Sequence, residues 1–358
     1  MSDCELQGAR VDVHEVGGRA RANRVNCEIE TNLIFKAHNL AAYFFVKWEP
    51  VVFDLMLLAA SVEFCDRIQR RPALGWGRSF ELRLPVHDPD VWNQKSVSDA
   101  LHEALELLMG DQWRIDFIQR RKPAVEPAQK LFYLETEAEA VIPFSDGLDS
   151  RAVGALMAEE YGSGLIRVRL GSKTKDWPKD ALGRKQPFMA LPYQVKSGSL
   201  RFVESSARSR GFKFAVLSGS AAYFAKARKV IVPESGQGAL GPALVPVGQA
   251  YEDYRNHPRF MSLMTSFFKA LLGTSIAFVF PRLWFTKGET LRAYMELSSG
   301  KDTEWSKTRS CCLPDRTAGE FHPPGLEVGH DAGRGLLPGQ HRQVAAVEVG
   351  AAHRAQRG

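Results

Sequence analysis

Short apolar segments alternate with helix-forming segments from about residue 131 onward, and this alternation limits the possible folds more than any other feature. Segments 150–161 and 209–227 have helical composition. The apolar segments have the length of strands and are Ala140 to Phe144, Leu165 to Leu170, Phe188 to Val195 and Lys229 to Val232. Strands that alternate with helices form βαβ units and a parallel sheet covered on both faces. The pattern therefore predicts an α/β fold whose ligands bind at the carboxyl ends of the strands, near a switch point.

Residues 1–130 differ from this pattern and are predicted to form a smaller α+β domain. Strands are expected in 32–46, 79–86 and 113–118, which are β-branched or alternate apolar with polar residues. Apolar residues recur at helical spacing in 53–68 and 97–109, which predicts two helices. No chemically reactive group of residues gathers here, so the predicted role is docking or scaffolding.

The composition excludes several classes of protein. The chain has 358 residues, of which 44% are hydrophobic and 25% charged, as in globular proteins. No apolar run reaches the roughly 18 residues of a membrane span, and the first residues lack a signal-peptide pattern. Five scattered cysteines predict reduced thiols and a cytoplasmic protein. The net charge of +6 permits an anionic ligand but does not by itself imply binding to nucleic acid.

A polar turn joins the first strand of the α/β region to the helix that follows it. The turn, called the Ser145–Ser150 loop below, consists of Ser145, Asp146, Gly147, Leu148, Asp149 and Ser150. Unpaired N–H groups and the helix dipole make such a helix N-terminus an anion site. The two serines add hydroxyl groups, Gly147 permits close approach of a ligand, and Asp149 can hold Mg²⁺ or orient the loop. An ordinary turn capped by Asp149 or Ser150 is the alternative, and the turn alone does not decide between the two.

The Ser145–Ser150 loop resembles the Ser-Gly-Gly-X-Asp-Ser pyrophosphate loop of the PP-loop ATP-pyrophosphatase superfamily. The resemblance implies a Rossmann-like parallel sheet of the adenine nucleotide alpha-hydrolase (HUP) type, with ATP and Mg²⁺ as cofactors. It also implies cleavage of ATP to AMP and pyrophosphate, with adenylation of a substrate. Asp146 stands where the superfamily has glycine; aspartate tolerates a left-handed backbone, but its charge repels phosphate unless a metal or Arg151 neutralises it.

Three further segments are similar to 7-cyano-7-deazaguanine synthase. Tyr251-Glu-Asp-Tyr-Arg255 resembles its Tyr-Pro-Asp-Cys-Arg segment, and Leu283 to Glu289 resembles its Thr-Lys-x-Glu segment. Thr308-Arg-Ser-Cys311 resembles the Thr-x-Ser-Cys that opens its zinc site. Residues 131–312 are therefore identified as a PP-loop ATP-binding domain of this kind. The whole chain resembles the synthase-like (QueC-like) component of the bacterial Qat anti-phage system.

The resemblance implies an ATP-dependent ligase that forms a C–N bond on a 7-deazaguanine carboxylate. Adenylation converts the carboxylate to a mixed anhydride, which an amine attacks to give an amide or, in the synthase, a nitrile. The implied catalytic residues are Asp149, Arg255 and Lys287, the last neutralising charge on the α-phosphate. Tyr251, Asp253 and Arg255 would hold the base. Ammonia and a protein amine both remain open as the acceptor.

Two other segments are candidates for ligand binding. A helix is expected to begin at Arg208-Ser-Arg210, where Arg208 and Arg210 either capture a phosphate or carboxylate or form a solvated basic face. Gly236-Gln-Gly238-Ala-Leu-Gly241 matches the dinucleotide fingerprint, but Pro242 and Pro246 predict an irregular loop there. Gly236 and Gly238 are instead expected to line the nucleotide or substrate.

The carboxyl-terminal residues depart from the synthases. Those enzymes bind structural zinc through four cysteines, whereas here Cys311 is followed only by the adjacent Cys312. No metal ligands are therefore predicted. Residues 313–358 contain little bulky apolar side chain and are predicted to be irregular, either disordered or a frame-shifted replacement of the zinc module.

Several alternative functions remain open. Asp146 and the missing zinc cysteines also suit a nucleotide-binding subunit of a defence complex with little activity of its own. A queuosine-pathway synthase is a second alternative. A tRNA-modifying sulfur transferase is disfavoured because no cysteine lies between Cys65 and Cys311. The expected partners are the 7-deazaguanine substrate and other proteins of a defence operon, one of them a possible acceptor, and neither a membrane nor nucleic acid is expected.

Overall fold

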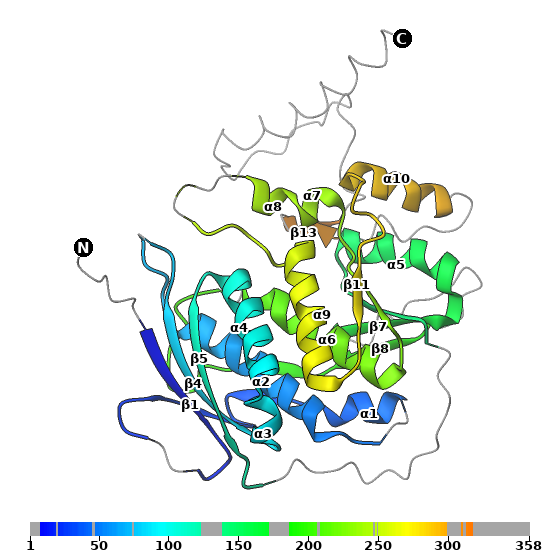
Figure 1. Ribbon diagram of the computed structural model, residues 1–358. Helices are drawn as coiled ribbons and strands as arrows, with labels where there is room; N and C mark the ends of the chain where they lie inside the picture. Colours follow the sequence, from blue (N-terminus) through cyan, green and yellow to red (C-terminus); the bar gives the residue numbers. More distant parts are fainter. Residues whose placement is uncertain are drawn as a thin grey trace. The chain divides into compact units, whose positions relative to one another are not determined.

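The computed structural model places most of the chain in two parallel sheets with helices between and around them (Figure 1). It describes residues 8–18, 21–44, 47–73, 75–122, 138–171, 186–205, 208–245, 248, 250–298, 309–310 and 313–317. All of these residues belong to one compact unit that ends at Glu320. Within the described residues, no helix is long and apolar enough to cross a membrane.

The second sheet along the chain is the one that the alternating pattern predicts. Its strands are β6 (Ala140–Pro143), β7 (Leu165–Leu170), β8 (Phe188–Leu191), β10 (Lys229–Ile231) and β11 (Ala277–Val279). They lie in the order β11-β10-β6-β7-β8, and all pairs are parallel. The chain runs outward from β6 in one direction through β7 and β8, and in the other through β10 and β11. The prediction of an α/β fold with a parallel sheet is confirmed.

One strand of this sheet is shorter than predicted. The segment expected to run from Phe188 to Val195 is divided at Pro192, which has no backbone N–H to donate to a neighbouring strand. Residues Tyr193–Val195 form β9, which leaves the sheet and pairs antiparallel with β3 (Leu33–Phe35).

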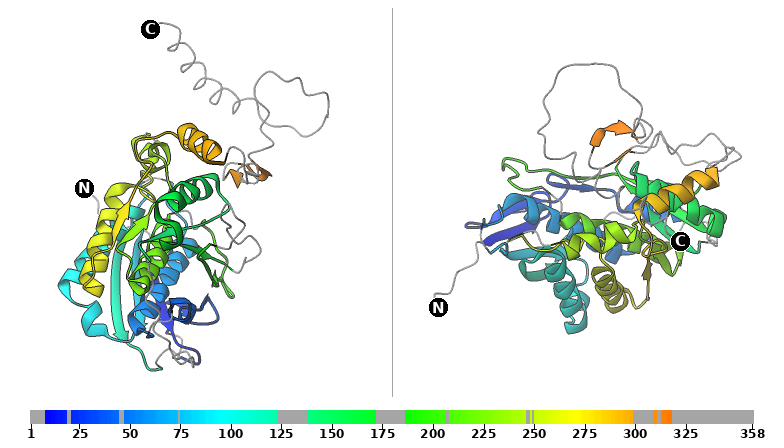
Figure 2. Two further views of the ribbon diagram at one scale, coloured as in Figure 1. Left: turned by 90° about the vertical axis from the view of Figure 1, so that its right-hand side faces the viewer. Right: turned by 90° about the horizontal axis from the view of Figure 1, so that it is seen from above.

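The helices of this half of the chain cover both faces of the sheet. The expected helices are present as α5 (Leu148–Tyr161) and α6 (Ser209–Ala225). On one face α5 packs against α10 (Lys287–Ser298), and these two helices lie side by side in Figures 1 and 2. On the other face α6 packs on β6, β7 and β10, next to α9 (Pro258–Leu272).

The first sheet is parallel, which corrects the α+β expectation for residues 1–130. Its strands are β1 (Gly8–His14), β2 (Val25–Glu28), β4 (Ser79–Val86) and β5 (Gln112–Gln119), in the order β2-β1-β4-β5. All three pairs are parallel, and helices α2 (Pro50–Ile68) and α4 (Lys95–Met109) connect them. Of the strands expected in 32–46 only β3 forms, because residues His38–Phe44 make helix α1. The alternating pattern predicted β4 and β5 but not β1 or β2, and it could not give the direction of the strands.

The two sheets share one hydrophobic core. Helix α2 packs along α6, and α4 packs along α9. A single cluster of buried apolar side chains includes Val11 and Leu82 of the first sheet and Val141 and Val230 of the second. The domain boundary near residue 130 stays a prediction. Helices from before this boundary pack directly against helices from after it.

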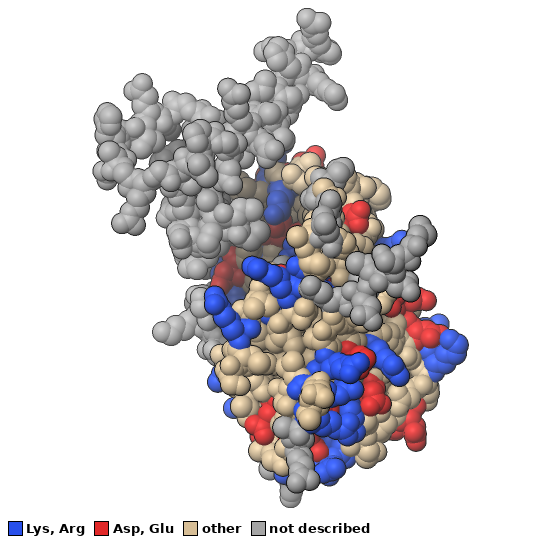
Figure 3. Space-filling model, turned by 90° about the vertical axis from the view of Figure 1, so that its left-hand side faces the viewer, with Lys and Arg blue, Asp and Glu red and all other residues tan. Residues whose placement is uncertain are grey.

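The outer face of the first sheet carries mixed charges. Figure 3 views the molecule from the side on which β1, β4 and β5 lie in Figure 1, and Lys or Arg atoms alternate there with Asp or Glu atoms. Arg83 contacts Asp12 and Asp116, each at 3.4 Å, and Arg10 contacts Glu81 at 3.2 Å. Neighbouring strands therefore neutralise each other's charges on this face.

Candidate nucleotide and substrate site

The candidate site lies at the carboxyl ends of β6, β10 and β11. The direction of the chain through the sheet reverses between β6 and β10, and the crevice at such a reversal is where open α/β sheets bind ligands. The turn after β10 is held against the turn after β11, because Gly236 N–H donates to the carbonyls of Arg282 (3.1 Å) and Phe285 (3.0 Å). The sheet order thus brings together segments that lie far apart in the sequence.

The Ser145–Ser150 loop connects β6 to α5. Ser145 Oγ accepts from Gly147 N–H at 3.1 Å and lies 2.7 Å from Ser150 Oγ. Helix α5 begins at Leu148 with Gly147 as its N-cap, and no side chain caps it. The alternative of a turn capped by Asp149 or Ser150 is therefore wrong, because both residues lie inside the first turn. The N–H groups of that turn are left for another acceptor.

Asp146 is neutralised by two arginines. Its Oδ1 lies 3.2 Å from Arg151 Nη2 and 2.5 Å from Arg169 Nη2. Burial alone would raise the pKa of Asp146, but Arg169 and then Arg151 outweigh burial and lower it. The sequence analysis expected either a metal or Arg151 to neutralise this carboxylate, and the structure places Arg151 there. Asp146 is not among the described residues with positive φ, so the expected left-handed tolerance is not used.

Arg169 was missed by the sequence analysis. It lies on β7, is almost completely buried, and also donates to the carbonyl of Phe144. Two arginines, Arg167 and Arg169, occur in an otherwise apolar strand. Because buried charges require partners, this pattern was a signal that could have been used.

Lys287 and Asp149 join the loop to α10. Their Nζ and Oδ2 atoms are 2.9 Å apart. Thr286 and Glu289 form a reciprocal capping box at the start of α10: Glu289 accepts from Thr286 N–H at 2.7 Å, and Thr286 Oγ1 accepts from Glu289 N–H at 3.1 Å. The threonine and glutamate of the Thr-Lys-x-Glu segment thus have a capping role, and they fix Lys287 at the first residue of the helix, facing the loop.

Glu234, which follows β10, was also missed. Its Oε1 accepts from Asn256 Nδ2 at 2.8 Å. Burial and the charge of Asp149 raise the pKa of Glu234 to about 7, although Lys287, Arg255 and Arg210 act in the opposite direction. Nothing in the local sequence around Glu234 distinguishes it from a surface carboxylate; only the sheet order brings it into the site.

The glycine-rich segment after Glu234 is helical, which corrects the predicted irregular loop. Residues Gly236–Ala239 form α7 and Gly241–Leu244 form α8, since Pro242 is tolerated in a first helical turn. A Cβ at Gly236 would lie 1.9 Å from the Leu283 carbonyl oxygen, and one at Gly238 would lie 2.1 Å from Glu234 Oε2. Gly236 is needed because a backbone carbonyl approaches it, whereas a side chain at Gly238 would displace the carboxylate of Glu234.

The Tyr251–Arg255 segment is stabilised by its own charges. Arg255 Nε lies 2.9 and 2.8 Å from the two carboxylate oxygens of Asp253, and Nη2 lies 2.5 Å from one of them. Burial would raise the pKa of Asp253, but the hydrogen bonds and charge of Arg255 lower it. Arg208 donates to the carbonyls of Tyr251 and Glu252. The structure therefore places Arg208 as a support of this segment, whereas Arg210 is exposed.

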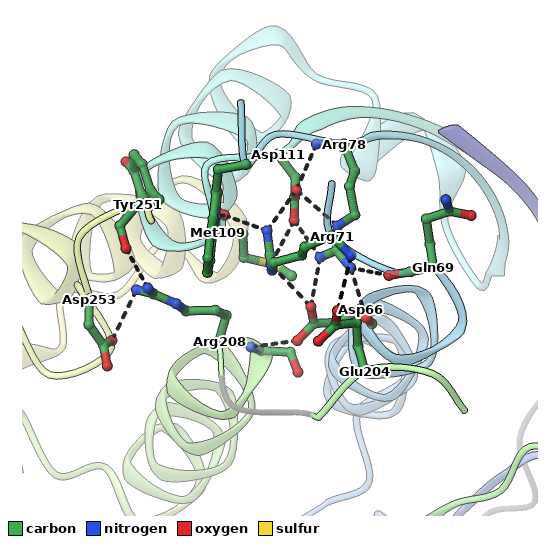
Figure 4. Close-up of polar contacts among 12 residues, drawn as sticks. Asp66, Gln69, Arg71, Arg78, Met109, Asp111, Glu204, Arg208, Tyr251 and Asp253 are labelled. Carbon is green, nitrogen blue, oxygen red and sulfur yellow. Dashed lines mark hydrogen bonds and ion pairs between the residues drawn. The ribbon is translucent and has the colours of Figure 1, made fainter. Parts of the chain in front are cut away.

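A buried network of Asp66, Arg71, Arg78 and Asp111 lies behind this segment (Figure 4). Arg78 is completely buried, and its Nη2 lies 2.7 Å from a carboxylate oxygen of each aspartate. Arg71 contacts the same two aspartates at 3.2 and 3.0 Å. Two positive and two negative side chains thus neutralise each other at the junction of the two sheets.

Tyr251 connects the Tyr251–Arg255 segment to this junction. Its hydroxyl donates to the Leu107 carbonyl at 2.9 Å. Gly110, the left-handed C-cap of α4 with a φ of 66°, lies so close that a Cβ there would be 2.8 Å from Tyr251 Cγ. The guanidinium groups of Arg71 and Arg208 lie over the ring of Trp76, 4.5 and 5.0 Å from its centroid. The first sheet and its loops therefore support the predicted base-binding segment.

The described residues offer no dedicated metal centre. They contain no group of three or more His, Cys, Asp or Glu side chains that could hold a metal ion. Cys311 and Cys312, with the histidines of the tail, lie outside the described residues. A Mg²⁺ ion that arrives with ATP needs only one or two carboxylates besides phosphate oxygens and water, and this demand fits the loop. Residues Leu313–Thr317, predicted to be irregular, form strand β13, which pairs with β12 (Arg309–Ser310).

Two comparisons with known proteins gave no relative of this chain. No family model matches the chain, and no curated protein matches it.

Proposed function

We propose that the chain is an ATP-dependent ligase of the 7-cyano-7-deazaguanine synthase type, with a Rossmann-like fold of the HUP class. It would adenylate a 7-deazaguanine carboxylate and pass it to an amine, in an anti-phage defence system. The cytoplasm would be its place of action, which suits the free buried thiols of Cys27 and Cys65.

The observation that carries the proposal is the position of the Ser145–Ser150 loop. The loop follows β6, next to the point where the direction of the chain through the sheet reverses, and it leads into helix α5, which no side chain caps. First-turn N–H groups and two hydroxyls there suit the pyrophosphate of ATP. Lys287 faces the loop from the other side of the reversal.

Different residues of the site would bind the nucleotide, stabilise charge and recognise the base. The loop would hold the pyrophosphate, and Lys287 would stabilise charge on the α-phosphate as the carboxylate oxygen attacks it. Asp149 would hold Lys287 in place. Asp253 and Arg255 would recognise the base through N–H and carbonyl groups. Mg²⁺, when bound with ATP, would supply neutralisation of the polyphosphate.

The experiment that tests the proposal measures the release of pyrophosphate from ATP in the presence of 7-carboxy-7-deazaguanine. We expect release that requires the carboxylate, together with AMP. Asp149→Ala should abolish it, whereas Glu159→Gln, at the exposed far end of α5, should not change it. No pyrophosphate from the wild-type chain would contradict the proposal.

The second candidate is a nucleotide-binding subunit without turnover. The 2.9 Å ion pair between Lys287 and Asp149 favours it, because Asp149 already neutralises the charge that Lys287 would offer to a phosphate. ATP binding by calorimetry with no pyrophosphate release would support this candidate. Queuosine synthesis would be indicated if the released product were the nitrile with ammonia as nitrogen donor.

A further inference from the structure

Glu234 lies where the two parts of the proposed reaction would meet. It follows β10, the neighbour of β6 at the reversal of the sheet, and so stands beside the Ser145–Ser150 loop. Its Oε1 is bound by Asn256, the residue after Arg255, at 2.8 Å. The carboxylate thus lies between the nucleotide loop and the substrate segment, where an adenylated carboxylate would be formed.

Three aspartates of the site are already paired with cations. Asp146 is bound by two arginines, Asp149 by Lys287, and Asp253 by Arg255. Glu234 has a hydrogen bond but no ion pair among the described residues. Glu289 also has no ion pair there, but it is exposed and its carboxylate caps α10. A carboxylate without a cation partner can accept a proton without breaking an ion pair.

The position of the Glu234 side chain is fixed from two directions. Asn256 holds Oε1, and Oε2 lies against Gly238, where even a methyl group would collide with it. The Glu234 carboxylate is therefore held in one position, and a general base must be positioned in this way.

We propose that Glu234 accepts the proton of the attacking amine in the second step, an inference that rests on the proposed function. The amine nitrogen bonds to the carbonyl carbon of the mixed anhydride, and the bond from that carbon to the AMP oxygen breaks. AMP leaves with the electron pair, and the surplus proton of the nitrogen passes to Glu234.

The electrostatics of the site suit this role. Burial and the negative charge of Asp149 raise the pKa of Glu234 to about 7, while Lys287, Arg255 and Arg210 limit the rise. A general base works best when its pKa lies near the working pH. Glu234 would be deprotonated in a large part of the molecules at neutral pH and would still be basic enough to take the proton.

The experiment separates the two steps in wild-type protein, Glu234→Gln, Glu234→Asp and the control Glu159→Gln. Exchange of labelled pyrophosphate into ATP, dependent on 7-carboxy-7-deazaguanine, measures adenylation. Amide formation with excess ammonium chloride measures the second step. Hydroxylamine, a nucleophile that is unprotonated at neutral pH, replaces ammonium in a parallel series and needs less help from a base.

We expect Glu234→Gln to keep the exchange and to lose amide formation by about 10²-fold or more, with product restored by hydroxylamine. Glu234→Asp should keep part of the activity and the rise of rate with pH, and Glu159→Gln should match the wild type. If Glu234→Gln exchanges pyrophosphate and forms the amide at the wild-type rate, the inference is wrong while the proposed function stands. If the wild type shows no exchange, both are wrong.

Discussion

At the scale of single residues, the balance of charge around the Ser145–Ser150 loop would govern the proposed binding of ATP. Asp146 adds a negative charge to a loop that would receive a polyphosphate, and Arg151 and Arg169 offset it. Arg169 is almost completely buried, so its removal would leave the carboxylate with one partner instead of two.

We therefore expect Arg169→Met to weaken ATP binding by about tenfold, because the loop becomes more negative by one charge at close range. The double variant Asp146→Asn with Arg169→Met should recover most of this loss, since the uncompensated charge is removed as well. Isothermal titration calorimetry with ATP measures both. Equal affinities for Arg169→Met and wild type would show that the pair does not govern binding.

Glu234 gives a second prediction at this scale, one that does not depend on activity. Its folded pKa of about 7 is above the ordinary value of 4.5, so the folded state binds the proton more tightly than the unfolded state. Its contribution to stability is complete below about pH 4.5 and is lost as the pH rises through about 7. Glu234→Gln should therefore raise the melting temperature more at pH 8 than at pH 5, relative to wild type. An equal shift at both pH values, measured by calorimetry, would mean that the carboxylate titrates normally.

At the scale of elements, the C-cap of α4 links the first sheet to the Tyr251–Arg255 segment. Gly110 has a φ of 66° and lies against Tyr251, whereas Gly273 ends α9 with a φ of 68° and has nothing within 4 Å. The two glycines share the same left-handed backbone conformation and differ in what an added methyl group would meet.

Gly110→Ala should thus raise the KM for the deazaguanine carboxylate several-fold without changing ATP affinity, and Gly273→Ala should not. Both should lose about 1–2 kcal/mol of stability from the left-handed backbone. Steady-state kinetics and chemical denaturation measure the two effects. If both variants have the KM of the wild type, Tyr251 does not depend on this contact.

The elements also show what the sequence could and could not give. Apolar spacing predicted α2 and α4, which bury apolar side chains, and helical composition after a strand predicted α5 and α6. Strand direction in the first sheet was not predicted, since alternation has the same period in parallel and antiparallel strands. Asp149 and Lys287 were predicted through motifs. Glu234 and Arg169 were not, because their partners are distant in sequence and only the order of the strands brings them near.

At the scale of the whole molecule, one core serves both sheets. Helices α2 and α4 from the first half of the chain pack against α6 and α9 from the second half. The buried arginine–aspartate network of Asp66, Arg71, Arg78 and Asp111 lies at the same junction, with Ser209 N–H donating to Asp66 at 3.2 Å. A cut near residue 130 would expose apolar faces of α6 and α9 that are buried in the intact chain.

A fragment that begins at residue 131 should therefore fail to fold cooperatively and should bind a hydrophobic dye, although it contains the whole Ser145–Ser150 loop. Burial of apolar area is the main stabilising term in folding, and this fragment would lose a large part of it. Far-UV circular dichroism during thermal unfolding and dye fluorescence measure the result. A fragment with a sharp unfolding transition that binds ATP would show that the first sheet is dispensable for the nucleotide site.

The most direct test of the account follows one oxygen atom. If the carboxylate is adenylated, 7-carboxy-7-deazaguanine labelled with oxygen-18 in its carboxyl group transfers one labelled oxygen to AMP when the amine displaces it. We predict, by mass spectrometry, AMP that carries a single heavy oxygen in amounts equal to the amide formed. Unlabelled AMP beside labelled amide, or ADP and phosphate in place of AMP and pyrophosphate, would contradict adenylation at this site.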